Sequence, residues 1–352
     1  MLLESFAQLN YRNLRTAQLT FASGITAITG ANAAGKSNLL EAIYLCCTGN
    51  TPGATIAENI TLGENEGSVQ ASLQHNEGSS RVQIGLARGR KVIRLDGQTV
   101  RAFELAKVTS AVLITPEDAA LVHGSPSLRR GYLDSLLGRI SPRYALLMRE
   151  YSRVVEQRNA LLKAGVFDDT LVVWSTRFCE LGDEINLLRR RAVARVNHLA
   201  SARYAAIAGA DKSLQVSLTS TPDQLAEALA NTAQQERARG VTVVGPHRAD
   251  LDLTLAGNSV QAFGSRGEAR TTALALRIAE YELLRDKHDE APVLLLDDFS
   301  AELDATRRDY LLGLAETTPQ ALVSGTEPPP SYRHHLVIKA GVVHVQDVPT
   351  RI

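Results

Sequence analysis

Cysteine and long apolar runs are scarce in this chain. Its 352 residues include three cysteines, Cys46, Cys47 and Cys179, with neither a CxxC pair nor a metal-ligand spacing. We therefore expect reduced packing residues rather than disulfides or a metal site. No apolar run approaches the roughly 20 residues of a membrane helix, and the N-terminus lacks a secretory signal. These absences predict a cytoplasmic protein with no membrane partner.

The chain also lacks net charge, with 38 basic and 38 acidic residues, which at first weighs against a nucleic-acid partner. The distribution is uneven, however. Residues 126–205 carry 14 basic and 8 acidic residues, whereas residues 206–352 carry 14 and 20. The basic section could neutralise the phosphates of a DNA duplex, notably through Arg189, Arg190, Arg191, Arg195 and Arg203. A solvated helix face with charge pairs four residues apart explains the same pattern.

Basic residues are not interleaved with aromatic ones, so the sequence does not indicate a platform for stacking single-stranded bases. No internal repeat or low-complexity tract is present either.

The chain does contain a complete phosphate-binding loop, GANAAGKS at residues 30–37. A β-branched run precedes it and an amphipathic helix follows it, which is the setting such a loop requires. Glycines let the backbone curl so that its N–H groups point at phosphate oxygens, and the helix N-terminus adds its dipole. Lys36 can reach the β- and γ-phosphates and Ser37 can ligate Mg²⁺. The predicted nucleotide-binding residues are Gly30, Ala31, Asn32, Ala33, Ala34, Gly35, Lys36, Ser37 and Asn38.

A second nucleotide-site feature lies near the C-terminus, where the apolar run 292–296 is followed at once by Asp297 and Asp298. The run is typical of a central parallel strand. A carboxylate at its end can hold the Mg²⁺ shell, and a second one can polarise an attacking water.

Two further segments indicate the class of phosphate-loop protein. An Asn-Lys-x-Asp guanine-reading segment is missing, which weighs against a GTPase. Residues 299–304 (FSAELD) resemble the segment that follows the catalytic acid in ABC-type ATPases. Residues 263–268 (FGSRGE) resemble the ABC signature, a turn at a helix N-terminus that acts across a dimer on the partner's γ-phosphate.

Segments outside the nucleotide motifs indicate a narrower family. Residues 9–14 (LNYRNL) match the Asn-aromatic-Arg-Asn opening of SMC-like and RecF-like ATPases. Further RecF-like segments follow in the family's order: TPED at 115–118, GSPSLRR at 124–130, QRNALLK at 157–163 and GPHRADL at 245–251. Across essentially its whole length the chain is similar to the RecF family of ABC/SMC-like ATPases.

The resemblance implies an ATPase of recombinational DNA repair at single-strand gaps, with ATP and Mg²⁺ as cofactors. The implied partners are double-stranded or gapped DNA, a second copy of the chain in an ATP-dependent homodimer, and other recombination-mediator proteins. It also implies an ABC-type ATPase head.

The family roles fall on named residues. The resemblance implies that Lys36 and the loop backbone should bind the triphosphate, that Ser37 and Asp297 should hold Mg²⁺, and that Asp298 should be the general base. Arg12 and Asn13 should lie beside the nucleotide. Ser265 and Gly267 should act in trans on the γ-phosphate, with Asp304 near the dimer seam.

Asp298 stands where ABC-type enzymes usually have a glutamate, although RecF-like proteins tolerate aspartate. Two departures from the ABC pattern matter: Ser324 and Thr326 stand where a histidine switch is common, and Glu268 replaces a common glutamine. A shorter base without the histidine implies slow hydrolysis, a timer rather than a motor. Other interpretations stay open: a transporter nucleotide subunit, opposed by the inserted helical segment, or an ATP-binding switch in which hydrolysis is incidental. Such a switch need not be a repair factor.

The predicted fold is α/β, a mixed sheet around the phosphate-loop helix with an inserted, mainly helical second lobe. Strands are expected at 68–74, 81–87, 92–95, 98–100, 111–114, 241–244, 292–296 and 321–324, with a terminal hairpin of 336–339 and 342–345. Residues 127–208 read as helical, and Thr221 opens another helix toward Gly240. The expected lobes are 1–118 (ATPase, first part), 119–240 (insertion) and 241–352 (ATPase, second part).

Overall fold

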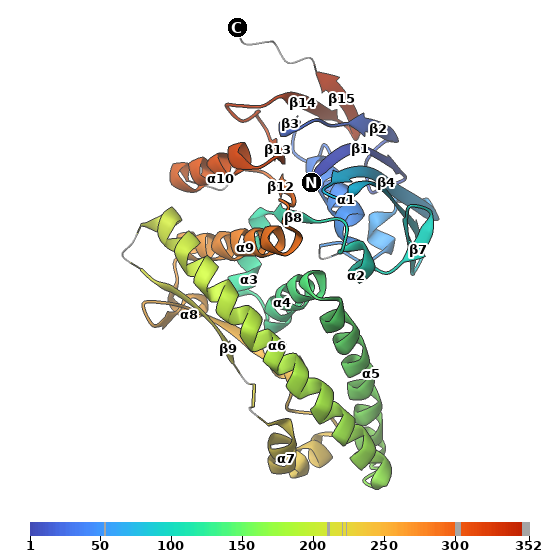
Figure 1. Cartoon of the computed structure of the whole chain (residues 1–352), viewed down its shortest axis with the longest axis vertical. Coiled ribbons are helices and arrows are strands. Elements are labelled where there is room, and N and C mark those ends of the chain that lie inside the picture. Colours follow the sequence, from blue (N-terminus) through green and yellow to red (C-terminus); the bar gives the residue numbers. More distant parts are fainter. Residues whose placement is uncertain (53, 210–211, 220, 223, 300–303, 347–352) are drawn as a thin grey trace. The chain divides into compact units, whose positions relative to one another are not determined.

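A computed structural model describes residues 1–346 apart from 53, 210–211, 220, 223 and 300–303. The chain divides into two compact units: the core unit comprises Met1–Asp118 and Arg277–Ile352, and the inserted unit comprises Ala119–Leu276. In Figure 1 the long green and yellow-green helices belong to the inserted unit, and the blue strands belong to the core unit. Among the described residues, no helix is both long and apolar enough to cross a membrane.

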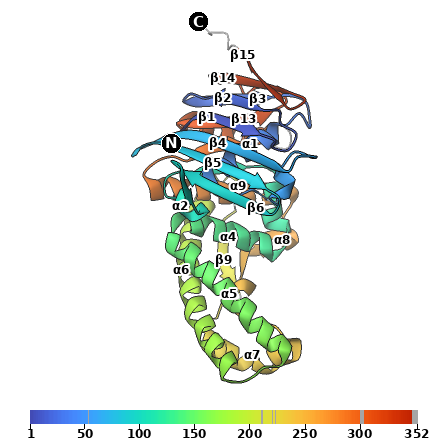
Figure 2. The same ribbon diagram turned by 90° about the vertical axis from the view of Figure 1, so that its right-hand side faces the viewer.

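The core unit is built on two sheets, each of six strands within the described residues. One is antiparallel, in the order β2-β1-β4-β5-β6-β7, and Figure 2 shows β2, β1, β4, β5 and β6 side by side. The other is mixed, in the order β15-β14-β3-β13-β12-β8, and only its β14–β15 pair is antiparallel. The strands are β1 (Leu2–Leu9), β2 (Ala17–Thr20), β3 (Gly24–Thr29), β4 (Glu66–His75), β5 (Gly78–Ala87), β6 (Arg90–Leu95), β7 (Gln98–Val100), β8 (Ala111–Ile114), β12 (Val293–Leu296), β13 (Gln320–Gly325), β14 (His334–Lys339) and β15 (Val342–Gln346).

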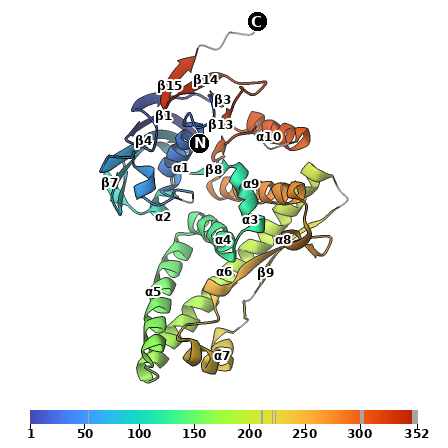
Figure 3. The same cartoon turned by 180° about the vertical axis from the view of Figure 1, so that it is seen from behind.

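Helix α1 (Lys36–Thr48) lies between the two sheets of the core unit (Figure 3). Most of its side chains are apolar and buried, apart from a polar face that carries Ser37 and Glu41, so the helix is covered on both sides. Leu39, Ile43, Cys46 and Cys47 are fully buried there in one core with residues of both sheets. Cys46 and Cys47 are therefore packing residues, as predicted, and they and the half-buried Cys179 are free thiols.

Short helices and α10 complete the core unit around this frame. They are η1 (Ala57–Asn59), α2 (Ala102–Leu105), η2 (Pro116–Ala119, which reaches the boundary between the units) and α10 (Ala305–Thr317). The predicted strands from 68 to 114, those at 292–296 and 321–324, and the terminal hairpin are confirmed.

The inserted unit is mainly helical, with a small antiparallel sheet in the order β11-β10-β9. Helices α5 and α6 run side by side, and α7 packs near their far end (Figure 1). The elements are α3 (Ala120–His123), α4 (Pro126–Ile140), α5 (Pro142–Ala164), α6 (Asp169–Ala208), β9 (Leu214–Thr219), α7 (Leu225–Arg239), η3 (Pro246–Arg248), β10 (Asp250–Leu255), β11 (Asn258–Ser259), α8 (Val260–Phe263) and α9 (Arg266–His288), the last of which continues into the core unit.

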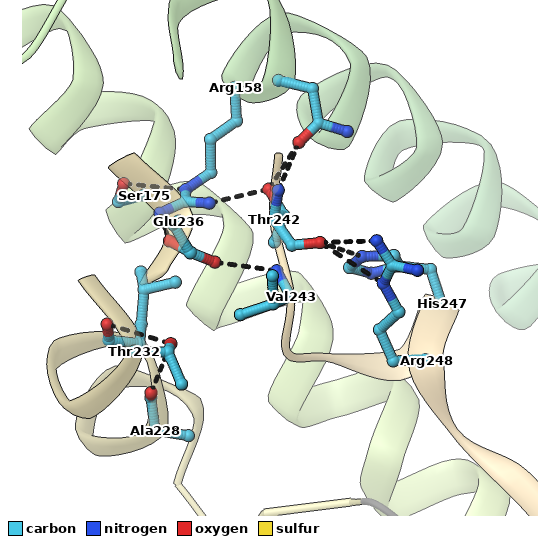
Figure 4. A network of polar contacts seen from close by, with 11 residues as sticks. Arg158, Ser175, Ala228, Thr232, Glu236, Thr242, Val243, His247 and Arg248 are labelled. Atoms are coloured by element: carbon cyan, nitrogen blue, oxygen red, sulfur yellow. Dashed lines mark hydrogen bonds and ion pairs between the residues drawn. The ribbon is translucent and has the colours of Figure 1, made fainter. Parts of the chain in front are cut away.

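Residues 241–244 do not form the predicted strand. Side chains bond their backbone instead (Figure 4): Thr242 N donates to Asn159 Oδ1 at 2.7 Å and Val243 N donates to Glu236 Oε1 at 3.0 Å. Thr242 O accepts from Arg248 Nη2 at 3.0 Å. Because side chains hydrogen-bond these two N–H groups and this carbonyl, they need no partners on a neighbouring strand.

The inserted unit ends at Leu276, beyond the lobe boundary at residue 240 that the sequence suggested. The reason is strand pairing: β10 pairs with β9 from Asp250↔Thr219 to Leu255↔Leu214. The chain therefore stays in the inserted unit until α9 has begun. Helix α7, which begins at Leu225 rather than at Thr221, separates the two paired strands in sequence and hides their relation.

Candidate nucleotide site

Parallel strands of the mixed sheet bring the candidate site together at one edge. The loop 30–37 follows β3, Asp297 follows β12, Thr115 follows β8, and Ser324 lies near the end of β13. These four strands are parallel neighbours, so their carboxyl ends share an edge. In open α/β sheets this edge is where ligands bind.

The loop 30–37 makes a tight connection from β3 to α1. Lys36 is buried, and its Nζ donates to the carbonyl oxygens of Gly30 at 2.9 Å and Ala31 at 3.1 Å. Gly35 is the N-cap of α1 and has a φ of 116°, which side-chain-bearing residues rarely adopt. Ser37 is exposed in the first turn of α1, where the helix dipole favours anions.

Arg12, Asn13 and Asn38 form a chain of hydrogen bonds that ends on this loop. Arg12 Nη1 donates to Asn38 Oδ1 at 2.8 Å, and Asn38 Nδ2 donates to Asn13 Oδ1 at 2.7 Å. Asn13 Nδ2 then donates to the carbonyl oxygen of Ala33 at 3.1 Å. All three predicted residues therefore adjoin the loop.

Ser324 holds the two aspartates at the end of β12. Its Oγ donates to Asp297 Oδ1 at 2.6 Å and accepts from Asp298 N at 2.9 Å, so one hydroxyl acts as both donor and acceptor. Asp298 has a φ of 47°, and both acids are half-buried. The residue that stands in the region of the missing histidine thus positions the acid pair.

Glu41 is a residue of this site that the sequence analysis missed. Its Oε2 lies 2.6 Å from Arg12 Nη2. Burial raises the pKa of its carboxyl group, Arg12 opposes the rise, and the charges of Asp297 and Glu117 add to it. Glu41 lies four residues after Ser37, hence on the same helix face, and this spacing was the available signal.

The turn after β8 is fixed by a buried carboxylate with a distant partner. Asp118 Oδ2 accepts from Thr115 N at 2.9 Å, and Asp118 Oδ1 accepts from Arg277 Nη2 at 2.7 Å. Burial raises the pKa of Asp118, and Arg277 opposes that rise. Arg277 stands 159 residues away in sequence, and no local pattern links the two.

The predicted signature residues, Ser265 and Gly267, belong to the inserted unit at the start of α9. Ser265 is exposed and forms a capping box with Glu268: Ser265 N donates to Glu268 Oε2 at 2.8 Å, and Glu268 N donates to Ser265 Oγ at 3.2 Å. Lys212 also pairs with Glu268, and its hydrogen bond, aided by those from Ser265, lowers the Glu268 pKa to about 2.

The segment after Asp298 is described only in part, since residues 300–303 lie outside the described residues. Asp304 is the N-cap of α10, where its Oδ1 accepts from Arg307 N at 3.0 Å.

The prediction that Arg189 lies along duplex phosphates is wrong. This side chain is fully buried: it donates to Asp134 Oδ1 at 2.6 Å, to Tyr144 Oη at 2.8 Å and to the Pro246 carbonyl at 2.6 Å. The inserted unit therefore uses part of its excess charge to join its own elements. The neighbouring Arg191 and Arg195 are exposed.

Comparison with known proteins gives matches along nearly the whole chain. Residues 2–329 match the family described as RecF/RecN/SMC N terminal domain. The protein named DNA replication and repair protein RecF of Deinococcus deserti is 47% identical over 343 residues, which cover 97% of this chain and 94% of that protein. Its namesake from Deinococcus radiodurans is 48% identical over 341 residues, covering 96% and 94%.

Solved structures agree in fold. The structure described as the recombination mediator protein RecF-ATP in the RecFOR pathway aligns with a TM-score of 0.90 at 27% identity, covering 98% of this chain and 97% of that one. The Smc head domain of Pyrococcus furiosus, bound to part of ScpA, aligns with a TM-score of 0.55 at 17% identity, covering 98% and 95%. The latter likeness concerns the fold alone, that of an ABC-type ATPase head.

Proposed function

This chain belongs to the RecF family within the RecF/RecN/SMC group, and from that premise we propose that it is an ATP-dependent, dimerising DNA-binding protein of recombinational repair at single-strand gaps. The observation that carries the proposal is the meeting of the Lys36 loop and the Asp297–Asp298 pair at one edge of a parallel sheet. The names of the relatives, a repair protein and a recombination mediator, support the repair role.

The loop 30–37 binds the triphosphate of ATP. Lys36 exchanges its bonds to the Gly30 and Ala31 carbonyls for phosphate oxygens, and the α1 dipole attracts the same anion. Arg12, Asn13 and Asn38 border the nucleotide through their bonds to the loop.

The Ser37 hydroxyl and the Asp297 carboxylate are the oxygen donors that Mg²⁺ prefers, so the residues fit this ion. Asp297 is half-buried and held by Ser324, which fixes one of its oxygens and leaves the carboxylate a further oxygen for the magnesium shell. When bound, Mg²⁺ offsets the negative charge of the phosphates. Asp298 accepts a proton from the attacking water as general base.

Hydrolysis is slow and occurs at composite sites of an ATP-dependent dimer. Ser265 and Gly267, at the N-terminus of α9, act on the γ-phosphate that the partner's loop holds. Glu268 would repel that phosphate as a free carboxylate, and its ion pair with Lys212 offsets the charge.

Duplex or gapped DNA binds to basic residues, and two surfaces compete for it. One includes Arg191 and Arg195 on α6, which are exposed. The other lies on strands β5 and β6 and their connection, where Arg81, Arg88, Arg90 and Arg94 are exposed. Lys91 is less suited, because its Nζ donates to the Gly49 carbonyl and burial lowers its pKa.

The proposal is tested by light scattering and DNA binding on one preparation, with and without ATP, using single-stranded, duplex and gapped DNA. The expected result is a dimer mass and tighter binding of duplex or gapped DNA at the same ATP concentration. An ATP-bound protein that stays monomeric contradicts the dimer. An ATP-dependent dimer with unchanged DNA affinity favours an ATP switch outside DNA repair.

A further inference from the structure

The turn of the terminal hairpin contacts the phosphate loop directly. Gly341, between β14 and β15, donates its N–H to the carbonyl oxygen of Ala34 at 3.0 Å. Its own carbonyl oxygen accepts from Arg15 N at 2.8 Å. One residue near the C-terminus thus joins the loop to the segment that carries Asn13.

The hairpin turn and the phosphate loop are packed so closely that neither glycine at their contact has room for a side chain. A Cβ atom added at Gly341 would lie 2.1 Å from the Asn13 carbonyl oxygen, a distance that real Cβ atoms essentially never show. A Cβ added at Gly30 would lie 2.4 Å from the carbonyl oxygen of Ile338, in β14. The hairpin backbone therefore lies against both the start and the middle of the loop.

The bond to Ala34 has a consequence for the amide that follows it. In a trans peptide the C=O and the next N–H point in opposite directions. Because the Ala34 carbonyl is held toward the hairpin, the N–H of Gly35 is directed away from the hairpin. Loop N–H groups are what such a loop offers to phosphate oxygens.

We infer that Gly341 is a positioning residue of the nucleotide site, which orients the Ala34–Gly35 peptide for the triphosphate. The inference rests on the proposed binding of ATP by the loop 30–37. It also predicts reciprocity: if Gly341 supports ATP binding, then bound ATP stabilises the hairpin turn by the same coupling.

The chain supplies a matched control for testing this role. Asp96-Gly97, between β6 and β7 of the same unit, has φ values of 49° and 84°, whereas Ala340-Gly341 has 47° and 78°. Both are two-residue hairpin turns with positive φ at both positions. A Cβ at Gly97 meets nothing within 4 Å. Gly97→Ala thus carries the same backbone strain but lies away from the loop.

The experiment measures ATPγS affinity and apo melting temperature for the full-length wild type, Gly341→Ala and Gly97→Ala. We expect both variants to melt lower than the wild type, whereas only Gly341→Ala loses affinity, by tenfold or more. Equal affinities in the two variants overturn the inference. A wild type that does not bind ATPγS instead refutes the proposed function on which the inference rests.

Hydrogen exchange on the wild type decides the case if Gly341→Ala does not fold. ATPγS should slow amide exchange in the peptide 334–346 while the Gly97 turn is unchanged. Equal exchange at residues 334–346 with and without bound ATPγS contradicts the coupling.

Discussion

Lys36 is the residue on which the nucleotide site depends most. In the proposed complex Lys36 bonds two phosphate oxygens in place of the Gly30 and Ala31 carbonyls, and Lys36→Ala removes both of these charge-assisted bonds. At about 1.5 kcal/mol each, this predicts a loss of ATP affinity of at least about a hundredfold. ATP-dependent dimerisation and DNA binding should be lost with it. Calorimetric titration with ATPγS measures the loss. Lys91→Ala is the control, because that lysine also donates to a backbone carbonyl, at Gly49 outside the loop. A Lys36→Ala protein that dimerises normally with ATP contradicts the composite site.

Asp298 allows binding to be separated from hydrolysis. Asn adopts positive φ more readily than most residues, so Asp298→Asn suits the φ of 47°, and the backbone bond to Ser324 does not involve the changed side chain. Removal of a general base predicts turnover lower by about 10² or more, with ATP binding and dimerisation retained. Phosphate release under single-turnover conditions is the measurement. Wild-type hydrolysis would place the base at another residue.

At the residue scale, the sequence predicted the positions of side chains that depend on neighbours in sequence. It missed the burial of side chains whose partners are distant in sequence. Asn38 lies at the loop because it follows Ser37 in the first turn of α1, and its side chain meets Arg12 and Asn13 there. The burial of Arg189 was not predictable, because its partners Asp134, Tyr144 and Pro246 stand 55, 45 and 57 residues away. An exposed and a buried arginine look the same in a charge count.

At the scale of elements, the N-terminus of α9 can be tested without disturbing the core unit. Ser265→Arg adds bulk at the turn that, in the proposed dimer, meets the partner's phosphate. We therefore expect normal ATP affinity in the monomer, no ATP-dependent dimer and little hydrolysis. Ser265→Ala is the matched control: it loses the same cap, at a cost of about 1 kcal/mol, but leaves the turn open. Light scattering with ATP compares the two. Weakened ATP binding by monomeric Ser265→Arg would instead place Ser265 in its own protomer's site.

The network of Figure 4 gives the inserted unit a pH dependence. Burial lowers the pKa of His247 to about 4, and its Nδ1 lies 2.8 Å from the Tyr151 hydroxyl, which suits the neutral ring. Since the folded pKa lies below the unfolded value of 6.5, this stability is fully present above pH 6.5 and is lost as the pH falls toward 4. The free energy of unfolding should fall by about 3 kcal/mol over this pH range. Urea unfolding of wild type and His247→Gln between pH 4 and 7 measures it, and parallel pH curves would contradict it.

The same network shows why element prediction failed at 241–244. A β-branched run of four residues fits a strand, yet Asn159 and Glu236 accept hydrogen bonds from the N–H groups of Thr242 and Val243. Those side chains lie on α5 and α7, and only the folded unit brings them to the segment. The hydrophobic pattern of a sequence indicates which residues are buried, but it does not indicate whether side chains or a neighbouring strand bond the backbone.

At the scale of the whole molecule, two basic surfaces are candidates for the proposed DNA binding. Residues 126–205 hold the excess of positive charge, but Arg129, Arg139, Arg158 and Arg189 are buried and unavailable for phosphates. Exposed arginines on β5 and β6 are fewer but lie close together in sequence. Net charge thus favours the inserted unit as the DNA-binding surface, but the burial of these four arginines leaves it less positive charge to offer to phosphates.

Two charge-reversal pairs decide between these surfaces, because each changes the net charge by the same amount. If the inserted unit binds the duplex, Arg191→Glu with Arg195→Glu should weaken binding of every DNA sequence. The slope of log affinity against log salt should fall by up to about 1.8, at about 0.9 for each phosphate that the variant no longer neutralises. Arg88→Glu with Arg90→Glu should then leave the slope unchanged. ATP affinity should be unaltered in both pairs, since none of the four residues belongs to the loop 30–37. If only Arg88→Glu with Arg90→Glu lowers the slope, the DNA-binding surface lies on the core unit. The charge of residues 126–205 would then serve the internal bonds of the inserted unit and its solvated helix faces.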